Sequence, residues 1–343
     1  MLENSDIAEL LARESEDAEG VLRLALRRAS RRAFMWPEQA HEVKAAGRSL
    51  TELEGVGPSI AKRIHGWIES PPEESEPPPI RREFMTRAKA RAHIAQHPDY
   101  RTRLNGDLQM HTEWSDGATS IREMAEAARE LGYKYIGITD HTKGLKIAGG
   151  ISEERLEEQG REIDTLNQEM KDFTVLRSAE MNLSPDGSGD MDPGALEKLD
   201  LVLGCFHSAL RRKEDQTDRY LAGVRNPGIQ VLGHPQTRIY NHREGLHCDW
   251  RRVFAEAARL DKAVEIDGDP SRQDLRLSLL EIAREEGVRI SLGTDAHHPE
   301  QFAYMDLSLG AACAAKIPPE QIINFLPVRE LLAWARSVRE ASR

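Results

Sequence analysis

The sequence predicts an α/β protein with parallel strands, arranged as a barrel or a doubly wound sheet and preceded by a small helical domain. Three observations support this fold class. From Gly106 onward, short apolar runs alternate six or seven times with amphipathic helical segments. The first 70 residues read as helices, with apolar positions at helical spacing. A proline- and glutamate-rich stretch, residues 71–80, separates the two parts, because proline sustains neither a helix interior nor a central strand.

The N-terminal part, residues 1–70, is predicted to be all helical. Its helical segments are 7–12, 20–34, 42–47 and 50–70, the last interrupted by a tight glycine turn. Residues 80–104 form a basic segment that we expect to be a helix leading into the second domain. Residues 71–104 are therefore interpreted as a linker followed by a basic helix.

The C-terminal part, residues 105–343, carries the alternating pattern. A short strand is expected near Gly106, and six more are expected at 135–140, 173–181, 199–206, 229–235, 263–268 and 288–295. The helices between them include 120–132, 152–171, 249–260 and 272–287. A helix between successive strands indicates parallel pairing. No glycine fingerprint for dinucleotides follows a first strand, which disfavours a Rossmann fold.

Composition narrows the class of protein. The 343 residues are 39% hydrophobic, and this length suits one large domain and a smaller one. No run of eighteen apolar residues occurs, and the N-terminus is acidic and amphipathic, so we expect a soluble cytoplasmic protein. Cys205, Cys248 and Cys313 are widely spaced, which favours buried thiols over disulfides or a thiolate zinc site. The net charge of -11 disfavours general attraction to nucleic acid, unless bound cations reverse the local sign.

Histidines and carboxylates recur where the predicted strands end. They are Asp107, His111, Asp140, His141, Glu180, His207, His234, Glu265, Asp295 and His297. In a strand-helix barrel the carboxyl ends of the strands meet on one face, so we expect these side chains to converge. A single histidine after a strand is more often a capping or core residue, but here the coincidence recurs after nearly every strand.

This set of residue types indicates a catalytic metal site. Imidazoles and carboxylates without thiolates suit zinc, manganese or iron. The set exceeds what a single cation can bind, so a cluster of two or three metals is expected. Such a cluster clamps the attacking and leaving oxygens of a phosphate ester.

Six motifs carry a resemblance to a known family. DLQMHTEWSDG, ITDHT, SAEMN, CFHS, GHPQTR and GTDAHH, in that order, resemble the ligand motifs of the PHP family, the polymerase and histidinol phosphatase domains. The resemblance covers about residues 105–330. It implies a distorted seven-stranded (β/α)7 barrel that holds a trinuclear metal centre.

The resemblance also implies which residues bind metal. The nine positions are Gln109, His111, Asp116, His141, Glu180, His207, His234, Asp295 and His297. His111, Glu180 and Asp295 would hold the first metal, and Glu180 would bridge to a second metal held by His207 and His234. Asp116, His141 and His297 would hold the third. Asp107 and Asp140 are expected to orient ligand histidines from behind.

Gln109 departs from the family pattern, which more often has two histidines in its opening motif. A glutamine offers a neutral oxygen, which binds zinc more weakly than imidazole does. Either Gln109 ligates weakly and favours a harder ion such as manganese, or the first metal is loosely held. The expected cofactors are therefore two or three divalent ions, Mn²⁺ or Zn²⁺, with Fe²⁺ as a further option.

The expected reaction is hydrolysis of a phosphodiester or phosphomonoester by a metal-activated water. His207 and His234 are candidates for moving a proton, and Asp295 is a candidate for bridging two metals. Arg238 and Arg272 are candidates for gripping a substrate phosphate, because guanidinium forks match phosphate oxygens. A structural ion pair is the alternative for each arginine.

A glycine hairpin in the N-terminal part suggests the substrate. Gly55, Val56 and Gly57 join two predicted helices, and Lys62 and Arg63 follow. Glycines allow a backbone that closes on a phosphate, and amides at a helix N-terminus attract anions. The stretch resembles the helix-hairpin-helix motif of non-specific DNA binders. The alternative is a turn that merely packs two helices together.

Residues 1–70 as a whole resemble the N-terminal domain of family X DNA polymerases, here followed by a PHP region with no polymerase core between them. This resemblance implies DNA as substrate and partner, with 3′-end processing, 3′–5′ exonuclease action or cleavage at abasic sites, and a role in DNA repair. The alternatives are a small-molecule phosphatase of histidinol phosphate or nucleotide type, and a non-catalytic DNA-binding adaptor. No membrane contact is expected, no protein partner is indicated, and a monomer is compatible with the sequence.

Overall fold

The computed structural model describes residues 1–73 and 76–342. Its main feature is a seven-stranded, all-parallel sheet in the order β1-β2-β3-β4-β5-β6-β7. The strands are Gly106–Asp107 (β1), Tyr135–Ile138 (β2), Thr174–Leu183 (β3), Leu201–Phe206 (β4), Val231–Leu232 (β5), Ala263–Asp267 (β6) and Arg289–Gly293 (β7). The expected α/β class with a seven-stranded barrel is confirmed. Residues 74 and 75 of the expected linker, and residue 343 of the second expected domain, lie outside the described residues.

Backbone contacts beyond the two outer strands bring β1 and β7 together at their carboxyl ends. The Asp295 amide donates to the Gln109 carbonyl (3.1 Å), and the His111 amide donates to the Ala296 carbonyl (2.7 Å). Met110 also forms a parallel bridge with Ala296. The sheet is therefore nearly closed into a barrel, and this closure lies next to the expected metal ligands.

At its other end the gap between β1 and β7 is filled by a side chain. The Asn324 Nδ2 atom donates to the carbonyls of Gly106 (2.9 Å) and Leu292 (2.8 Å), while its Oδ1 atom accepts from the Leu292 amide (2.7 Å). Asn324 is fully buried. Its amide thus satisfies backbone groups that a neighbouring strand would otherwise pair. We call this contact the barrel seam.

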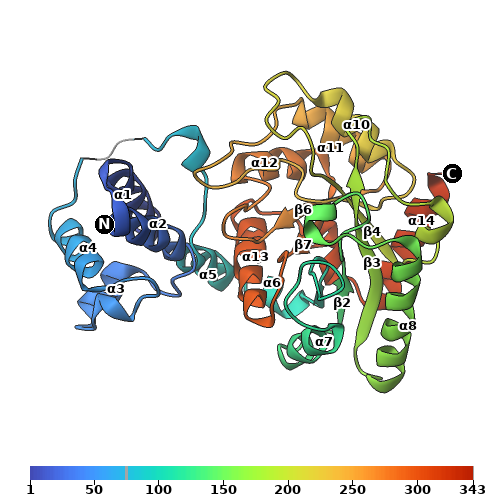
Figure 1. The fold of residues 1–343 in the computed structure, drawn as a ribbon, viewed down its shortest axis with the longest axis horizontal. Coiled ribbons are helices and arrows are strands. Elements are labelled where there is room, and N and C mark those ends of the chain that lie inside the picture. Colours follow the sequence, from blue (N-terminus) through green and yellow to red (C-terminus); the bar gives the residue numbers. More distant parts are fainter. Residues whose placement is uncertain (74–75, 343) are drawn as a thin grey trace.

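Helices surround the barrel, as Figure 1 shows. They are Ile121–Glu130 (α7), Glu153–Glu169 (α8), Pro193–Leu196 (α9), Thr217–Arg225 (α10), Trp250–Arg259 (α11), Leu277–Glu286 (α12), Met305–Ala314 (α13) and Val328–Ala341 (α14). Side-chain caps start several of them, such as Ser120 before α7 and Asp249 before α11. Helix α14 packs Leu331 and Trp334 against the amino ends of the strands. The carboxyl ends stay open for a site.

The N-terminal helices lie to one side of the barrel (Figure 1). They are Asn4–Asp17 (α1), Gly20–Ala33 (α2), Ala40–Ala45 (α3) and Pro58–Glu69 (α4), and they share an apolar core of their own. Gly55 has φ +79°, a left-handed conformation that glycine adopts without strain, and Pro58 occupies the first turn of α4. Among the described helices of the whole chain, none is both long and apolar enough to cross a membrane.

The basic segment 80–104 differs from expectation. The expected single helix is wrong: two helices, Arg87–Gln96 (α5) and Pro98–Arg103 (α6), are separated at His97 because Pro98 has no amide hydrogen to continue the helix. Helix α5 packs tightly on α13, where a Cβ atom added to Gly310 would lie 2.5 Å from the Ala90 Cβ. This part of the expected linker is therefore packed against the barrel.

Three arginines of this segment converge on one carboxylate. Arg87 Nε lies 2.8 Å and Arg91 Nε 3.3 Å from Asp306 Oδ2, and Arg101 also pairs with Asp306. Asp306 belongs to α13 and is largely buried. The positive charge of α5 and α6 is thus partly used to hold these helices on the barrel.

The helical region and the barrel meet at the loop after β5. The Tyr240 ring packs edge-on against Phe34 of the helical region (centroids 4.7 Å apart) and Phe84 (5.1 Å). Its hydroxyl lies 3.2 Å from Ser30 Oγ. Arg81, also buried, donates to Glu9 Oε2 (2.8 Å) and to Asn241 Oδ1 (3.0 Å). A barrel loop is therefore part of the helical core.

Candidate metal centre

Glu180 lies fully buried at the centre of the polar cluster formed by the strand ends. Its Oε1 atom is 2.8 Å from His207 Nε2 and 2.9 Å from His234 Nε2. Its Oε2 atom is 3.2 Å from His111 Nε2, and that nitrogen is 2.9 Å from Asp295 Oδ1. Four residues expected to bind metal thus lie around the carboxylate of a fifth, Glu180.

A second group of expected ligands surrounds Asp116. The Asp116 carboxylate lies 3.4 Å from His297 Nε2, 3.6 Å from His141 Nε2 and 3.8 Å from His111 Nδ1. The His111 ring stacks between the other two imidazoles, with centroids 4.4 Å and 4.5 Å away. The structure therefore brings together the three residues expected at the third metal and adds His111 to them.

Four overlapping groups have ligand atoms within 4.8 Å of one another. They are His111, Asp116, His141 and His297; His141, Glu180 and His207; Glu180, Cys205 and His234; and His111, Glu180 and Asp295. Glu180 belongs to three groups and His111 to two. Shared ligands of this kind suit a multinuclear metal centre better than separate sites.

The buried histidines have nitrogen atoms without hydrogen-bond partners. Among the described residues, both ring nitrogens of His111, Nδ1 of His141, Nε2 of His207 and Nδ1 of His234 are buried and unsatisfied. Buried polar atoms are nearly always satisfied in native proteins. Imidazole nitrogens and carboxylate oxygens at one place are the donors that divalent transition metals use, so these residues fit such ions.

The electrostatics of the cluster is dominated by burial and by close opposite charges. Burial opposes charge on His111, but the Asp295 and Glu180 carboxylates outweigh it and raise the pKa of His111 well above its usual value. Burial lowers the pKa of His141 to about 4. Burial also works against the Glu180 carboxylate, but neighbouring histidines, His141 and His234 foremost, hold its pKa well below the usual range.

Gln109 lies beside the same carboxylate. Its Nε2 atom donates to Glu180 Oε2 (3.1 Å), and its Oε1 atom is buried without a partner. A Cβ atom added to Gly293 would lie 3.1 Å from that oxygen, so the amide is held in a close-fitting space. The free lone pairs of Gln109 are therefore inside the cluster.

Asp107 and Asp140 do not contact histidines in the way we expected. Asp140 accepts hydrogen bonds from the amide (2.8 Å) and hydroxyl (2.7 Å) of Thr112 and from Gln159 Nε2 (2.6 Å). Asp107 accepts from the Thr294 hydroxyl (2.6 Å), and burial raises its pKa to about 7. Among the described hydrogen bonds, neither carboxylate pairs with an imidazole. Both instead fix the loops that carry the ligands.

Two residues of the cluster, Cys205 and Asp267, were not expected to belong to it, and a third, Glu265, was expected there without an assigned role. Cys205 lies with Glu180 and His234, and it precedes His207 by two positions on β4, so side-chain alternation along the strand was the available signal. Glu265 Oε2 accepts from the His234 amide (2.7 Å). Burial raises the pKa values of both Glu265 and Asp267 well above their usual range.

The two candidate phosphate-binding arginines have different surroundings. Arg272 lies at the cluster, with its Nε atom 3.3 Å from Asp295 Oδ2. Arg238 is buried at the contact with the helical region: its guanidinium lies 3.6 Å from the Phe84 ring and donates to the Arg82 carbonyl (2.7 Å). The Arg238 side chain is thus occupied by structural contacts.

The glycine hairpin packs against α2, where a Cβ atom added to Gly55 would lie 3.1 Å from Arg32 Cγ. Lys62 is exposed, whereas Arg63 pairs with Glu14 (2.8 Å). Arg32 and Glu54, which flank the hairpin, form an ion pair (3.0 Å). Burial raises the pKa of Tyr304, and its hydroxyl is within electrostatic range of that ion pair and of Asp295 in the cluster. Tyr304 therefore lies between hairpin and cluster.

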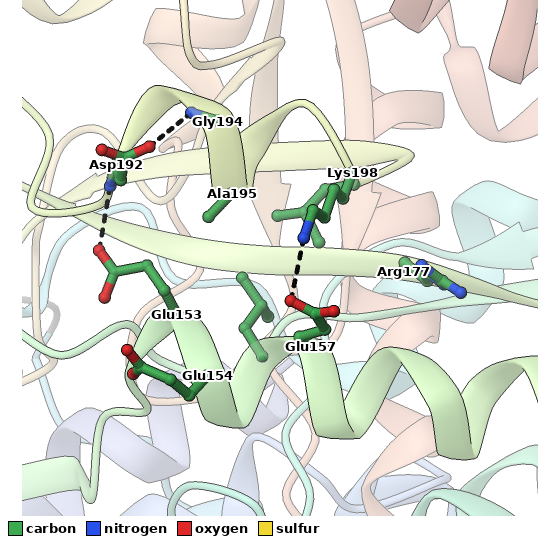
Figure 2. A pocket seen from close by; sticks show the side chains of 10 residues that line it. Glu153, Glu154, Glu157, Arg177, Asp192, Gly194, Ala195 and Lys198 are labelled. Atoms are coloured by element: carbon green, nitrogen blue, oxygen red, sulfur yellow. Dashed lines mark hydrogen bonds and ion pairs between the residues drawn. The ribbon is translucent and has the colours of Figure 1, made fainter.

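A separate cavity of about 330 Å³ lies between α8 and α9, outside the barrel (Figure 2). Four of its ten lining residues are acidic, and two are basic. Glu153 accepts from the Asp192 amide (3.1 Å), and Glu157 pairs with Lys198 (2.9 Å), as the dashed lines show. Its lining includes no histidine, and it contributes nothing to the cluster.

Comparison with known proteins identifies the barrel. Residues 107–268 match the PHP domain. The DNA polymerase/3′-5′ exonuclease PolX of Bacillus subtilis is 36% identical over 234 residues, which are 68% of this chain and 41% of that protein. The chain thus spans less than half the length of this relative.

Further relatives correspond to the barrel alone. A probable phosphatase of Caldicellulosiruptor bescii is 26% identical over 64% of this chain and 91% of its own length, and the probable phosphatase YcdX of Escherichia coli is 27% identical over 67% and 94%. A crystal structure of histidinol phosphate phosphatase from Lactococcus lactis, with zinc, L-histidinol and phosphate, covers 70% of this chain and 94% of its own at 17% identity and a TM-score of 0.43.

The family match covers the ends of β1 to β6 and the ligand candidates there, whereas Asp295 and His297 after β7 lie beyond it. The sequence match begins at Asp107, where β1 ends, and extends through β6 to Gly268. Residues 107–268 of this chain therefore carry a PHP domain, and its relatives include proteins named as a 3′-5′ exonuclease and as probable phosphatases.

Proposed function

We propose that this phosphoesterase acts on DNA and removes nucleotides or blocking groups from 3′ ends as a metal-dependent 3′–5′ exonuclease. The observation that carries the proposal is the convergence of buried, unsatisfied imidazoles around Glu180 and Asp116. Such groups are costly to bury unless a ligand uses them. Cleavage at abasic sites is the nearest related activity of the same centre.

We assign nine residues to metal binding. Gln109, His111, Glu180 and Asp295 would hold one ion, Glu180 with His207 and His234 a second, and Asp116, His141 and His297 a third. The nitrogen and oxygen donors suit Mn²⁺ or Zn²⁺. When bound, these ions would lower the pKa of a water and offset negative charge on the phosphate.

The protein's own groups supply position and charge. Glu180 remains ionised among the histidines that surround it, so it can hold two neighbouring cations in place. Arg272 carries a guanidinium beside Asp295, where it can donate to a non-bridging phosphate oxygen. His207 Nδ1 contacts Asn182 Oδ1 (3.1 Å), an arrangement that directs Nε2 towards Glu180 and the second ion.

The assignment of DNA as substrate rests on the helical region. Its hairpin of Gly55, Val56 and Gly57 presents backbone amides at the start of α4, with Lys62 exposed nearby. Arg63 has its charge paired with Glu14, so it contributes less than Lys62. The name of the PolX relative supports a 3′–5′ exonuclease.

A small-molecule phosphatase is the second candidate function. It is favoured by the relatives named probable phosphatases, whose length corresponds almost entirely to the barrel of this chain. In such a protein the helical region would restrict the mouth of the site. Histidinol phosphate and nucleoside monophosphates are the substrates to compare.

One experiment separates these functions. Purified protein is incubated with Mn²⁺ and separately with Zn²⁺ on 5′-labelled single-stranded, nicked and abasic-site DNA, and phosphate release from histidinol phosphate and nucleoside monophosphates is measured in parallel. We expect shortening of the DNA from its 3′ end, and a loss of roughly a hundredfold or more in the His234→Ala variant because one ion loses a ligand.

Two controls accompany this assay. His247→Ala removes an exposed histidine outside the cluster and should retain full activity. Chelation followed by metal addition should abolish and then restore cleavage. Phosphate release from the small esters with intact DNA would contradict the DNA assignment, whereas equal activity in His234→Ala would contradict the metal centre itself.

A further inference from the structure

Three arginines lie on three neighbouring loops at the carboxyl ends of the strands. Arg211 follows β4, Arg243 follows β5 and Arg272 follows β6. Arg272 is the innermost, with its Nε atom 3.3 Å from Asp295 Oδ2 of the metal centre. Arg211 contacts Nε2 of His242 (3.0 Å), the neighbour of Arg243, and the Tyr240 amide of the same loop donates to the carbonyl of Ser271 (2.7 Å), which precedes Arg272. The three cations thus form a row leading away from the centre, which we call the arginine row.

The two outer members of the row have no carboxylate partner among the described residues. Arg243 Nε donates to the Thr237 carbonyl (2.6 Å), and Arg211 donates to His242 Nε2 (3.0 Å). The nearest acids in sequence are engaged elsewhere: Glu214 lies 3.6 Å from Arg212, and Glu244 lies 4.0 Å from His247.

Within the described part of the chain, Arg243 and Arg211 thus lack the close counter-charge that many other arginines have. It has 58 acidic and 47 basic residues, and other exposed arginines, such as Arg251 with Glu285 and Glu286, are paired. Like charges held close together without acidic partners are unfavourable. An anionic ligand is the physical reason for keeping them there.

The outer part of the row is held in place before any ligand binds. Residues 239–243 form a tight turn, in which Ile239 and Arg243 pair through their backbones (2.8 and 2.9 Å) and Asn241 has φ +53°. Tyr240 at this turn is buried in the core of the helical region, while His242 is exposed and contacts Arg211. Cations fixed in this way bind an anion with little loss of conformational entropy.

We propose that the arginine row binds successive phosphates of one polynucleotide strand whose reactive phosphate lies at the metal centre. The inference rests on the proposed function and names its substrate more closely. A monoester carries a single phosphate and requires only Arg272. A strand has a phosphate at every nucleotide, so Arg243 and Arg211 can each meet a further one. The row therefore selects a chain of at least three phosphates over a mononucleotide.

The test measures binding of the metal-loaded full chain to fluorescent oligothymidylates of two, four and twelve nucleotides with phosphorothioate linkages, which resist hydrolysis. The variants are Arg211→Gln, Arg243→Gln and the double variant. Arg329→Gln is the matched control, since Arg329 is an exposed arginine in the first turn of α14 at the opposite end of the barrel. Binding is recorded over a series of salt concentrations.

We expect each row substitution to lower the slope of log affinity against log salt by about 0.7, the value for one phosphate contact on a single strand. Affinity for the four- and twelve-nucleotide strands should fall at least about fivefold, and the double variant should no longer prefer them over the dinucleotide. Arg329→Gln should behave as the unmodified protein does. Because Arg211 is exposed, its variant keeps the test valid even if Arg243→Gln disturbs the turn.

Three results would overturn the proposal: unchanged salt slopes in both row variants, an equal loss of affinity for thymidine monophosphate, or poly-L-glutamate binding with the same sensitivity to both substitutions. Failure of the proposed function is recognised separately. Row-dependent binding with no hydrolysis of ordinary DNA would reject the nuclease and keep the row. Cleavage of DNA with row-independent binding would reject the row and keep the nuclease.

Discussion

Gln109 is the residue at which the metal centre departs most from a set of imidazoles and carboxylates. Its amide donates to Glu180 and leaves its oxygen without a partner inside the cluster. A neutral amide oxygen is a harder and weaker donor than imidazole. The first ion should therefore be held less tightly than the second, which has two histidines and the shared carboxylate.

A Gln109→His variant tests this difference. The imidazole adds a strong donor to the site of the first ion, so we expect zinc affinity there to rise by roughly tenfold or more. Calorimetric titration of the metal-free protein with Zn²⁺ and Mn²⁺ measures the change, with zinc gaining more than manganese. Identical affinities and an unaltered metal preference would show that Gln109 does not face an ion.

The order of motifs along the sequence was sufficient to predict which residues cluster, because strand ends of a parallel barrel share one face. Cys205 was not selected, since a buried thiol within a strand has no distinctive neighbour in the sequence, and Glu265 was expected at the strand ends but was given no role in metal binding. Arg238 was a candidate phosphate ligand with a structural ion pair as the alternative, and the sequence did not reveal Phe84, the distant ring that its guanidinium contacts. Contacts of this kind depend on tertiary packing, which a motif does not contain.

The presence and order of the barrel strands and helices were predicted better than the residues at which they begin and end. All seven strands were expected, but β5 comprises only Val231 and Leu232, far shorter than its apolar run. An apolar run reports burial, whereas a strand also needs paired backbone groups on both sides. Pro98 likewise divided a segment whose composition alone favoured one helix.

The barrel seam allows us to predict the effect of one substitution on the stability of the barrel. Asn324→Ala would remove three buried hydrogen bonds and leave backbone groups of Gly106 and Leu292 unsatisfied, which should lower the free energy of unfolding by about 3 kcal/mol. Urea denaturation followed by circular dichroism measures the loss. Asn167→Ala is a useful comparison, because Asn167 makes two hydrogen bonds to Val175 beside α8 (2.9 and 2.8 Å) away from the seam. A smaller effect at Asn324 than at Asn167 would contradict the role of the seam.

At the scale of the whole molecule, Tyr240 links the helical region to the metal centre. It is six residues beyond His234 and is buried among Phe34 and Phe84. The sequence did not reveal this contact, since the loop that carries Tyr240 has no periodicity to relate it to a distant core. Movement of the helical region would therefore displace the loop that begins with His234.

Truncation of this side chain should release the helical region. Tyr240→Ala would lose aromatic packing worth about 3 kcal/mol or more, so the segment between α4 and α5 should be cleaved at least about tenfold faster in limited proteolysis. Tyr240→Phe removes only the hydroxyl contact with Ser30 and should resemble the unmodified protein. If the alanine variant were cleaved at the unmodified rate, the two regions would be held together by other contacts.

The seam also constrains the order in which this molecule can acquire its structure. Asn324 donates to the carbonyl of Gly106, which lies 218 residues earlier in the sequence, so the first strand cannot be secured until the chain has been synthesised almost to α14. Contacts between distant positions form slowly, whereas the N-terminal helices depend on local contacts. On the ribosome, the helical region should therefore mature early. The ligand groups on either side of the gap should assemble last, so that metal loading follows completion of the chain.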